Sequence, residues 1–332
     1  MSGKLIFGLD GGATKSHLAV FDCNGKCAGI TVYGPLNHEV MRGSFTELED
    51  RLSEFISSAL KKADASIDDV AYAVFGLAGA DTDAQHDRIK EIVRRIGLKE
   101  YVVYNDAFLG VAAGCPNCVG ICAINGTGFK LAAIDKSAVA VQTCGVGEYS
   151  DDRGGGSWYG LRAIGSVYNE LYRLGKPTAM REMIYELIGV SRREDYLEVI
   201  AEKFPGGRLN SVALNSVVFN AAALGDAVAL GVLEESAEQY AGAIARLAMD
   251  MDFPQDETLH VTLAGSVFVR QKVRILQELI EKRVDKALGE RVVEYTRIDT
   301  PPVAGAVIWA AQKAGINIDM TSIKAALKAA GL

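Results

Sequence analysis

The sequence has little positive charge, few histidines and no long apolar run that is free of turn residues. Its 332 residues include 35 Lys and Arg against 42 Asp and Glu, giving a formal net charge of −7. This balance excludes the basic footprint of a protein that binds nucleic acid or an anionic membrane, and it favours a small neutral or phosphorylated partner. The longest charge-free stretch, 107–129, could span a bilayer by length, but Gly114, Pro116 and Asn125 interrupt it with turn chemistry.

Signals for export and for disulfide formation are also missing. The N-terminal segment MSGKLIFGLD shows neither a signal peptide nor a lipidation motif, so we expect a cytoplasmic protein. The six cysteines are therefore expected to be free thiols. Cys115, Cys118 and Cys122 form a C-x2-C-x3-C run that leaves an iron–sulfur or zinc site as an alternative, although no fourth ligand is evident.

The length and the 49% apolar content are sufficient for two domains, each with its own core. The first domain begins with a predicted three-strand antiparallel meander, whose short runs of Leu, Ile and Val are joined by glycine turns. Its expected strands are 4–9, 16–21, 27–33, 70–75 and 101–104, with helices after the third, fourth and fifth. Ser44 and Glu47 suggest a capping box for the first of these helices. The apolar face of that helix is formed by Leu48, Leu52, Phe55, Ile56, Ala59 and Leu60.

The same pattern starts again at residue 119, which indicates an internal duplication. The expected elements of the second copy are strands 119–124, 129–134, 138–143, 259–264 and 291–295, helices 266–287 and 303–314, and a helical insertion at about 157–250. We expect an N-terminal lobe of residues 1–115, to which the C-terminal helix 316–332 could belong, and a C-terminal nucleotide-binding lobe of residues 116–315. The fold class is α/β with mixed sheets flanked by helices, and a ligand is expected in the cleft between the lobes.

The turn after the first predicted strand has the chemistry of a phosphate-binding hairpin. Gly11 and Gly12 would let backbone N–H groups approach phosphate oxygens, and Thr14 could add a hydroxyl donor next to Lys15. Asp10 would help to hold a hydrated Mg²⁺ ion. The alternative is that these glycines only form a tight turn.

The second copy has an equivalent turn at Asn125-Gly126-Thr127-Gly128. Two such hairpins, one in each lobe, could clamp the phosphates of ATP, with Thr127 and Gly128 as the second set of donors. Gly265 and Ser266 follow a predicted strand and open a helix, so their N–H groups could accept the adenosine or α-phosphate end of a nucleotide.

Asp106 follows the fifth predicted strand and precedes an apolar helix. A carboxylate in this place could accept the proton of an attacking sugar hydroxyl during phosphoryl transfer. The alternative role for Asp106 is the N-cap of the helix, because aspartate is among the preferred capping residues.

Two loops carry side chains that suit a carbohydrate. Asn37 and His38 offer an amide and an imidazole to sugar hydroxyls or an acetamido group. The glycine-rich segment 144–160 combines carboxylates, such as Asp152, with aromatic rings, and the alternative for it is a flexible linker. His17, His86 and His260 show no metal-ligand spacing, so we expect them to be structural or solvated.

Taken in order, these motifs resemble the N-acetylglucosamine kinases and the related BadF/BadG/BcrA/BcrD-type ATPases. The resemblance covers nearly the whole chain and is carried by FGLDGGATKS, PLNH, VFGLAGAD, VVYNDAFLG, INGTG, CGVGEYSDDRGGGSWYG, LAGSV and PPVAGAVIWA. It implies two duplicated ribonuclease H-like lobes of the actin-like ATPase fold, ATP and Mg²⁺ as cofactors, an amino-sugar substrate and a homodimer. Asp106 then matches the catalytic base, and the sugar pocket matches Asn37, His38, Gly79, Thr127, Gly145, Val146, Gly147 and Asp152.

Two departures from the family pattern concern the choice of sugar. Val146 stands where tryptophan is usual, and Arg153-Gly154-Gly155 replaces Glu-Gly-Ser after Asp152. The smaller Val146 could make room for N-acetylmuramic acid, and Arg153 could pair with the lactyl carboxylate of that sugar. N-acetylglucosamine is the expected acceptor, with N-acetylmuramic acid and glucosamine as alternatives.

Two other functions compete with the sugar kinase. One is an ATPase that activates a radical dehydratase or reductase, but the cysteine-flanked glycine motifs expected of such an activator are not recognisable here. The other is a sugar-responsive repressor, which would carry a DNA-binding domain before the first strand.

Overall fold

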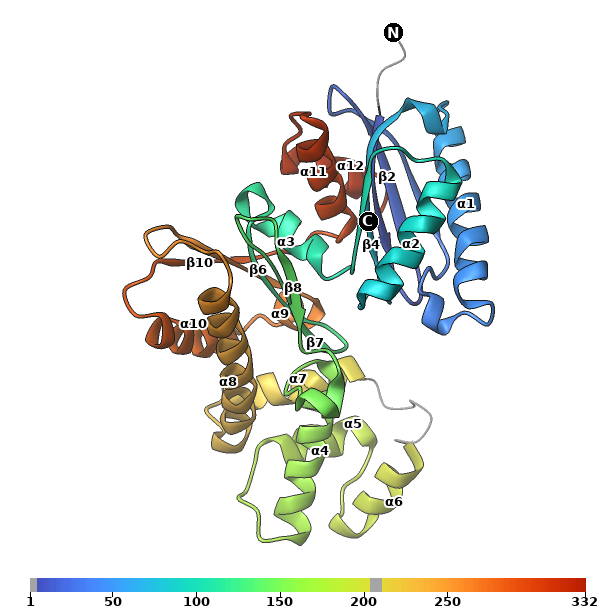
Figure 1. Cartoon of the computed structure of the whole chain (residues 1–332). Helices are drawn as coiled ribbons and strands as arrows, with labels where there is room; N and C mark the ends of the chain where they lie inside the picture. The colour runs from blue at the N-terminus through green and yellow to red at the C-terminus, as the bar shows by residue number, and fades with distance from the viewer. Residues whose placement is uncertain (1–4, 204–210) are drawn as a thin grey trace. The chain divides into compact units, whose positions relative to one another are not determined.

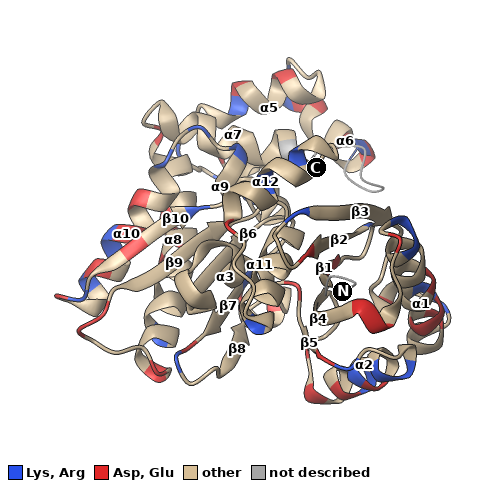
Figure 2. Cartoon of the chain, turned by 90° about the horizontal axis from the view of Figure 1, so that it is seen from above, with Lys and Arg blue, Asp and Glu red and all other residues tan. Residues whose placement is uncertain are grey.

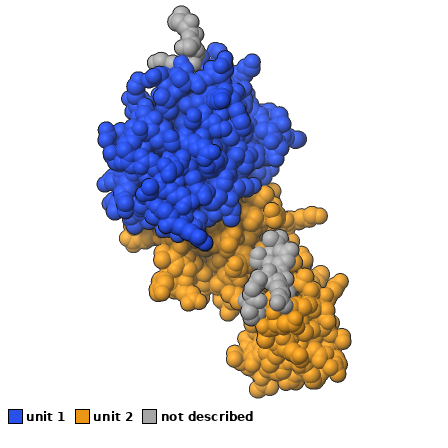
Figure 3. Space-filling model, turned by 90° about the vertical axis from the view of Figure 1, so that its right-hand side faces the viewer, with its two compact units in different colours: residues 1–122, 132–140, 298–332 blue, residues 123–131, 141–297 orange. Residues whose placement is uncertain are grey.

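The computed structural model describes residues 5–203 and 211–332, so residue 4 of the first predicted strand and residues 204–210 of the predicted insertion lie outside it. The chain divides by its contacts into two compact units, coloured in Figure 3. Unit 1 contains residues 1–122, 132–140 and 298–332, and unit 2 contains residues 123–131 and 141–297. The lobe boundaries expected from the sequence stay a prediction.

The first five-stranded sheet has the order β3-β2-β1-β4-β5, with β1, β2 and β3 antiparallel and β4 and β5 added in parallel. The predicted meander and the later strands are thus confirmed. The elements around this sheet are β1 (Leu5–Gly11), β2 (Ser16–Asp22), β3 (Cys27–Tyr33), η1 (His38–Val40), α1 (Ser44–Lys62), η2 (Ile67–Asp69), β4 (Val70–Leu77), α2 (Asp83–Ile96), β5 (Tyr101–Tyr104), α3 (Phe108–Gly114), η3 (Pro116–Cys118), α11 (Val303–Ala314) and α12 (Met320–Ala329).

Helices cover both faces of this sheet: α1 and α2 lie on one side, and α11 and α12 on the other (Figure 1). Strand β1 is therefore buried on both faces, with Phe7 and Leu9 in the core beneath α1 and α2. On the opposite face, α11 lies so close to β1 that a side chain on Gly8 would overlap the backbone of Val307. The six residues that the helical periodicity placed on the apolar face of α1 are all buried.

The start of α1 differs from the prediction. The N-cap residue is Gly43, without a side-chain cap, and Ser44 has a left-handed φ of 47°. The predicted box between Ser44 and Glu47 is not formed, because the carboxylate of Glu47 accepts a hydrogen bond from the N–H of Gly43 at 3.0 Å. The helix therefore has its N-cap residue at Gly43, one position before the serine that the sequence pattern predicts.

The second sheet has the order β10-β9-β6-β7-β8, which repeats the order of the first sheet when it is numbered from its own first strand. This repeat confirms the internal duplication. The elements are β6 (Gly120–Asn125), β7 (Phe129–Ile134), β8 (Ala140–Thr143), η4 (Gly147–Ser150), α4 (Gly156–Tyr172), α5 (Met180–Ile188), α6 (Arg193–Lys203), α7 (Ser211–Ala223), α8 (Ala227–Asp250), β9 (Leu259–Ala264), α9 (Ser266–Arg270), α10 (Ile275–Leu288) and β10 (Val293–Arg297).

The predicted helix 266–287 is wrong as a single element, because it is broken into α9 and α10. Gln271 has an extended backbone at the break. Its side-chain amide donates to the side chain of Asn215 at 3.0 Å, and its carbonyl accepts from Arg297 at 3.4 Å. Tertiary hydrogen bonds thus replace the helical ones that the apolar periodicity predicted.

Charges of both signs alternate along the outer helices, as Figure 2 shows for α2. Arg95 of α2 pairs with Glu49 of α1, and Arg94 pairs with Glu91 one turn away. Among the described residues, no single helix combines the length and the apolar character needed to cross a membrane. The α7–α8 pair passes the same criterion only when both helices are counted together, and they are bent by 111°.

Candidate functional site

The first glycine hairpin is tied by its backbone to two other loops of unit 1. The carbonyl of Gly12 accepts from the N–H of Leu36 at 3.0 Å, and the carbonyl of Gly11 accepts from the N–H of Ala78 at 2.8 Å. These bonds bring together the predicted phosphate hairpin, the PLNH loop and the loop after β4. Thr14 and Lys15 lie exposed at the hairpin tip.

Asp10, the residue before the last of β1, lies beside a histidine that the sequence did not assign to the site. In the β1–β2 register Asp10 lies opposite His17, and their side chains approach to 3.6 Å between Oδ2 and Nδ1. The His17 side chain is 6% exposed and that of Asp10 is 14% exposed. The hairpin register could have revealed this neighbour, because Asp10 and His17 are symmetric about the turn.

Asn37, His38 and Gly79 are brought together, although about forty residues separate the loop from the glycine. Gly79 has a left-handed φ of 83°, and an ideal Cβ there would lie 3.0 Å from Nδ1 of His38. Asn37 and His38 are both buried, and the His38 ring stacks on Phe45 with centroids 4.0 Å apart. Substrate contact by these three residues stays a prediction.

The hydrogen bonds around Gln85 define the tautomer of His38. The Oε1 atom of Gln85 accepts from the N–H of Thr82 at 2.9 Å, so its Nε2 is the end that faces Nε2 of His38 at 3.5 Å. An amide nitrogen can only donate there, so Nε2 of the neutral imidazole accepts and Nδ1 carries the proton. Among the described residues, Nδ1 is a buried atom without a hydrogen-bond partner. Burial is the main cause that lowers the pKa of His38 below its ordinary value.

Asp106 is half-buried two residues after β5. Its alternative role as N-cap is wrong, because Ala107 is the N-cap residue of α3. No side chain caps α3, but the Oδ1 of the buried Asn105 accepts from the N–H of Ala107 at 3.0 Å and holds the turn that leads into the helix. The Nδ2 of Asn105 donates to Asp81 at 3.1 Å. Asn105 and Asp81 are thus supporting residues that the sequence motifs did not single out.

In unit 2, the hairpin between β6 and β7 lies against the turn after β9 and the start of α4. An ideal Cβ on Gly265 would lie 2.5 Å from the carbonyl oxygen of Asn125, and one on Gly155 would lie 2.6 Å from that of Thr127. Both glycines have left-handed φ values, 97° and 86°. The hairpin that carries the predicted residues Thr127 and Gly128 is therefore packed against Gly265, and Ser266 is exposed next to Gly265.

The loop 144–153 is organised by Asp152. Its Oδ2 accepts from the N–H groups of Gly145 at 2.8 Å and Gly147 at 2.9 Å, and its Oδ1 accepts from the hydroxyl of Ser150 at 2.8 Å. The loop residues predicted to line the sugar pocket, Gly145 and Gly147, are thus held together by the carboxylate of Asp152. The expected bond from Asp152 to a sugar stays a prediction, and Val146 is 63% exposed.

The cysteines are free thiols, and the C-x2-C-x3-C run lies buried in unit 1. Burial raises the pKa of Cys118 to about 12 and raises that of Cys122 as well, which disfavours the thiolate form that ligates metals. Over residues 5–203 and 211–332, no group of three or more His, Cys, Asp or Glu side chains is arranged to hold a metal ion.

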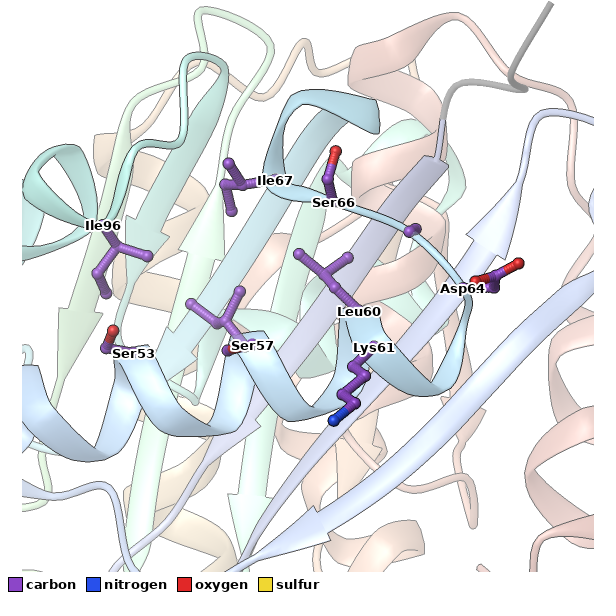
Figure 4. Close-up of a pocket in the computed structure, with 10 residues that line it drawn as sticks. Ser53, Ser57, Leu60, Lys61, Asp64, Ser66, Ile67 and Ile96 are labelled. Carbon is purple, nitrogen blue, oxygen red and sulfur yellow. The ribbon is translucent and has the colours of Figure 1, made fainter.

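A separate cavity of about 390 Å³ lies on the outer side of unit 1, between α1, the loop that follows it and α2 (Figure 4). Its lining combines Leu60, Ile67 and Ile96 with Ser57, Ser66 and other polar residues. None of the residues predicted for the site lines this cavity.

Two sheets of the same strand order, each with a glycine hairpin after its first strand, define a two-lobed α/β protein of the actin-like fold class. The model of the BadF/BadG/BcrA/BcrD ATPase family matches residues 7–310, and the chain belongs to this family. The family and the fold class expected from the sequence are confirmed, and with them the expected use of ATP.

Named relatives are kinases, the enzyme class expected from the sequence. The N-acetylmuramic acid/N-acetylglucosamine kinase of Clostridium acetobutylicum is 26% identical over 266 residues, which cover 80% of this chain and 85% of that protein. The N-acetyl-D-glucosamine kinase of Dictyostelium discoideum is 21% identical over 319 residues, covering 93% and 98%. The crystal structure of the ROK hexokinase from Thermus thermophilus shares the fold, with a TM-score of 0.55 and 16% identity over 93% of this chain and 98% of that chain.

Proposed function

We propose that this protein transfers the γ-phosphoryl group of ATP to a hydroxyl of an N-acetylated amino sugar. The observation that carries the proposal is the backbone bonding in unit 1. The hydrogen bonds from Leu36 to Gly12 and from Ala78 to Gly11 join a phosphate-type hairpin to the two loops that hold Asn37, His38 and Gly79. A phosphate-binding turn and a buried polar cluster thus share one scaffold, as a phosphotransferase requires.

The nucleotide is assigned to the glycine hairpins. In this proposal Gly11, Gly12, Thr14 and Lys15 of unit 1, with Thr127, Gly128, Gly265 and Ser266 of unit 2, supply N–H, hydroxyl and ammonium donors to the phosphates. The exposed tips of both hairpins support it, because Thr14, Lys15, Thr127 and Gly128 are all accessible.

Asp10 fits a hydrated Mg²⁺ ion held through water. A single carboxylate at a strand end suits this ion, which keeps several waters and binds few protein ligands. The ion would neutralise charge that develops on the transferring phosphoryl group. Asp10 would orient the bound water, and His17 would limit the freedom of the Asp10 carboxylate.

The sugar is assigned to the buried polar cluster and to the Asp152 loop. The unpartnered Nδ1–H of His38 is a donor suited to a hydroxyl or acetamido oxygen, and the fixed amide of Asn37 lies beside it. The glycines Gly145 and Gly147, with Val146 between them, would line the sugar from the loop that Asp152 organises.

Asp106 is the proposed general base. The acceptor hydroxyl oxygen forms a bond to the γ-phosphorus, its proton passes to the Asp106 carboxylate, and the bond from phosphorus to the bridging oxygen breaks so that ADP leaves with that electron pair. The half-buried position after β5, supported by Asn105 on one side, favours this role.

The acceptor sugar is the finer part of the proposal. The name of the Clostridium relative includes both N-acetylmuramic acid and N-acetylglucosamine. In this chain Arg153 is an exposed guanidinium paired with Asp151 at 2.8 Å, one residue after Asp152. A lactyl carboxylate could take the place of Asp151, so we include N-acetylmuramic acid with N-acetylglucosamine as an acceptor. From the resemblance we also propose a homodimer, which light scattering on the purified protein would test.

The experiment is a substrate panel with ATP and Mg²⁺, in which ADP release and the sugar phosphate are measured together. The panel contains N-acetylglucosamine, N-acetylmuramic acid, glucosamine and glucose. Phosphorylation of one or both N-acetylated sugars, with ADP and sugar phosphate formed in equal amounts, is the expected result. ADP release that does not depend on any sugar would overturn the kinase and favour the activator-type ATPase.

A further inference from the structure

A buried hydrogen-bond chain runs from the second glycine hairpin into the helices of unit 2. The Nδ2 of Asn125 donates to the hydroxyl of Tyr159 at 3.1 Å, and that hydroxyl lies 2.6 Å from the hydroxyl of Ser236. All three residues are 0% exposed. Asn125 ends β6 at the hairpin, Tyr159 lies in the first turn of α4, and Ser236 lies in the middle of α8.

The direction of the chain follows from its donors and acceptors. The Oδ1 of Asn125 accepts from the N–H of Gly155 at 2.9 Å, so the Nδ2 end must face Tyr159 and donate. The Tyr159 oxygen then accepts from Asn125, and its own proton is available to the Ser236 oxygen. Burial raises the pKa of Tyr159 to about 12, so the hydroxyl keeps that proton at physiological pH.

Asn125 is therefore bonded at both ends of its amide, once to the backbone before α4 and once to a side chain within α4. The N–H of Gly156 adds a bond to the carbonyl of Gly126 at 2.8 Å. Gly155 and Gly265 approach this hairpin so closely that neither could carry a side chain without displacing it. Thr127 and Gly128 form the exposed tip of the hairpin. The contacts that hold this tip are made by the residues beneath it and not by the side chain of Thr127.

We infer that Asn125, Tyr159 and Ser236 are positioning residues for the nucleotide hairpin, which fix Thr127 and Gly128 in the conformation that binds the phosphates of ATP. The inference rests on the proposed function for the identity of the ligand. In this inference, none of the three side chains contacts the nucleotide. Their effect passes through the backbone of residues 125–128, and it couples that backbone to the helices α4 and α8.

The test compares Tyr159→Phe and Ser236→Ala with Tyr196→Phe. Tyr196 is a matched control because it is also 0% exposed in unit 2, but its hydroxyl donates to the carbonyl of Ile164, away from the hairpin. Binding of the ATP analogue AMPPNP with Mg²⁺ is measured by calorimetry without sugar, and urea unfolding is measured for each variant. KM for ATP and for the sugar follow from the kinase assay.

The expected result is that Tyr159→Phe weakens AMPPNP binding by about tenfold, because a buried amide and a buried hydroxyl each lose a partner. KM for ATP rises in parallel, while KM for the sugar stays within about twofold. Ser236→Ala shifts the affinity in the same direction, and Ser236→Thr, which keeps a hydroxyl, restores it. Tyr196→Phe lowers stability comparably and leaves the affinity for AMPPNP unchanged.

The outcomes separate this inference from the proposed function. If Tyr159→Phe and Ser236→Ala bind AMPPNP as tightly as the wild type, the chain has only a structural role and the inference is overturned. If the wild type binds AMPPNP but phosphorylates no sugar, the proposed function fails, and the variants still decide the inference. If Tyr159→Phe does not fold, the comparison of Ser236→Ala with Ser236→Thr tests the inference. Absence of any nucleotide binding by the wild type would overturn both.

Discussion

An ideal Cβ on Gly79 would lie 2.5 Å from the amide oxygen of Asn37, closer than real Cβ atoms come. Because Gly79 also has a φ of 83°, its backbone favours glycine for two independent reasons. The loop after β4 can therefore lie against the PLNH loop only while residue 79 has no side chain. This close approach brings Asn37 and His38 into one polar cluster.

The first prediction concerns this approach. We expect Gly79→Ala to displace Asn37 and to raise KM for the sugar by about tenfold or more, because overpacking and a strained φ together cost at least ~1.4 kcal/mol. Affinity for AMPPNP should stay unchanged. Steady-state kinetics and calorimetry measure the two quantities.

Gly231→Ala is the control for this substitution. Gly231 lies inside α8 with no atom within 4 Å of an ideal Cβ, so alanine there should not affect the sugar. An equal KM for the sugar in Gly79→Ala and in the wild type would contradict the assignment of this cluster to the acceptor.

A second prediction tests the support of Asp106. Asn105 is 1% exposed and makes hydrogen bonds to the N–H of Ala107 and to Asp81. Asn105→Ala should lower the free energy of unfolding by about 1–3 kcal/mol, since the buried N–H of Ala107 loses its partner and Asp81 loses a hydrogen bond. It should also lower kcat more than it raises KM for ATP. Urea unfolding and kinetics check this, and a variant with wild-type kcat would show that Asn105 does not position the base.

A third prediction is a pH dependence that originates at His38. Burial lowers the pKa of folded His38 below its unfolded value of about 6.5, so the unfolded chain binds the proton more readily. The stability contributed by neutral His38 is therefore full above the unfolded pKa and is lost as pH falls through the folded pKa. Protonation also removes the acceptor at Nε2 that faces Gln85. The groups that face this ring include Glu39, Arg88 and Asp81.

Urea unfolding of the wild type and of His38→Gln at pH 7.5 and pH 5.5 measures this contribution. The wild type should lose more stability between the two pH values than the variant, which lacks the titrating ring. Equal losses in the two proteins would exclude His38 as the source.

A fourth prediction concerns the choice of acceptor. Arg153→Ala should lower kcat/KM for N-acetylmuramic acid by up to about fivefold, since an exposed charge-assisted pair contributes up to ~1 kcal/mol, while kcat/KM for N-acetylglucosamine stays unchanged. Arg162→Ala is a matched control, because Arg162 is an exposed arginine of the same unit paired with Glu235. An unchanged ratio of the two kcat/KM values in Arg153→Ala would count against the proposed contact.

Much of the fold could be predicted from the sequence because its strands and helices follow simple periodicities. The face of α1 and the duplicated strand order are examples of this. Predictions from local sequence patterns were wrong at helix ends and breaks that depend on tertiary hydrogen bonds. Ala107, and not Asp106, is the N-cap residue of α3, although aspartate is the residue type that suits an N-cap. The break at Gln271 depends on Asn215 and Arg297, which are distant in sequence.

For the candidate site, the sequence was most informative where a glycine turn lies next to a short polar motif. Gly265 lies against Asn125 and Gly126 of the second glycine hairpin, and Gly79 lies against Asn37. The supporting residues could not be predicted in the same way. The link from Asn125 through Tyr159 to Ser236 joins residues more than a hundred positions apart, and a buried tyrosine in an apolar helix carries no distinctive pattern.

The central claim is that Asp106 accepts the proton of a sugar hydroxyl while ATP is held by other residues. The most direct measurement compares kcat and AMPPNP affinity in the wild type, in Asp106→Asn and in Asp87→Asn, an exposed aspartate of α2 that serves as control. We predict that Asp106→Asn lowers kcat by about 10²–10⁴-fold with AMPPNP affinity retained, while Asp87→Asn resembles the wild type. A kcat in Asp106→Asn close to that of the wild type would contradict the account.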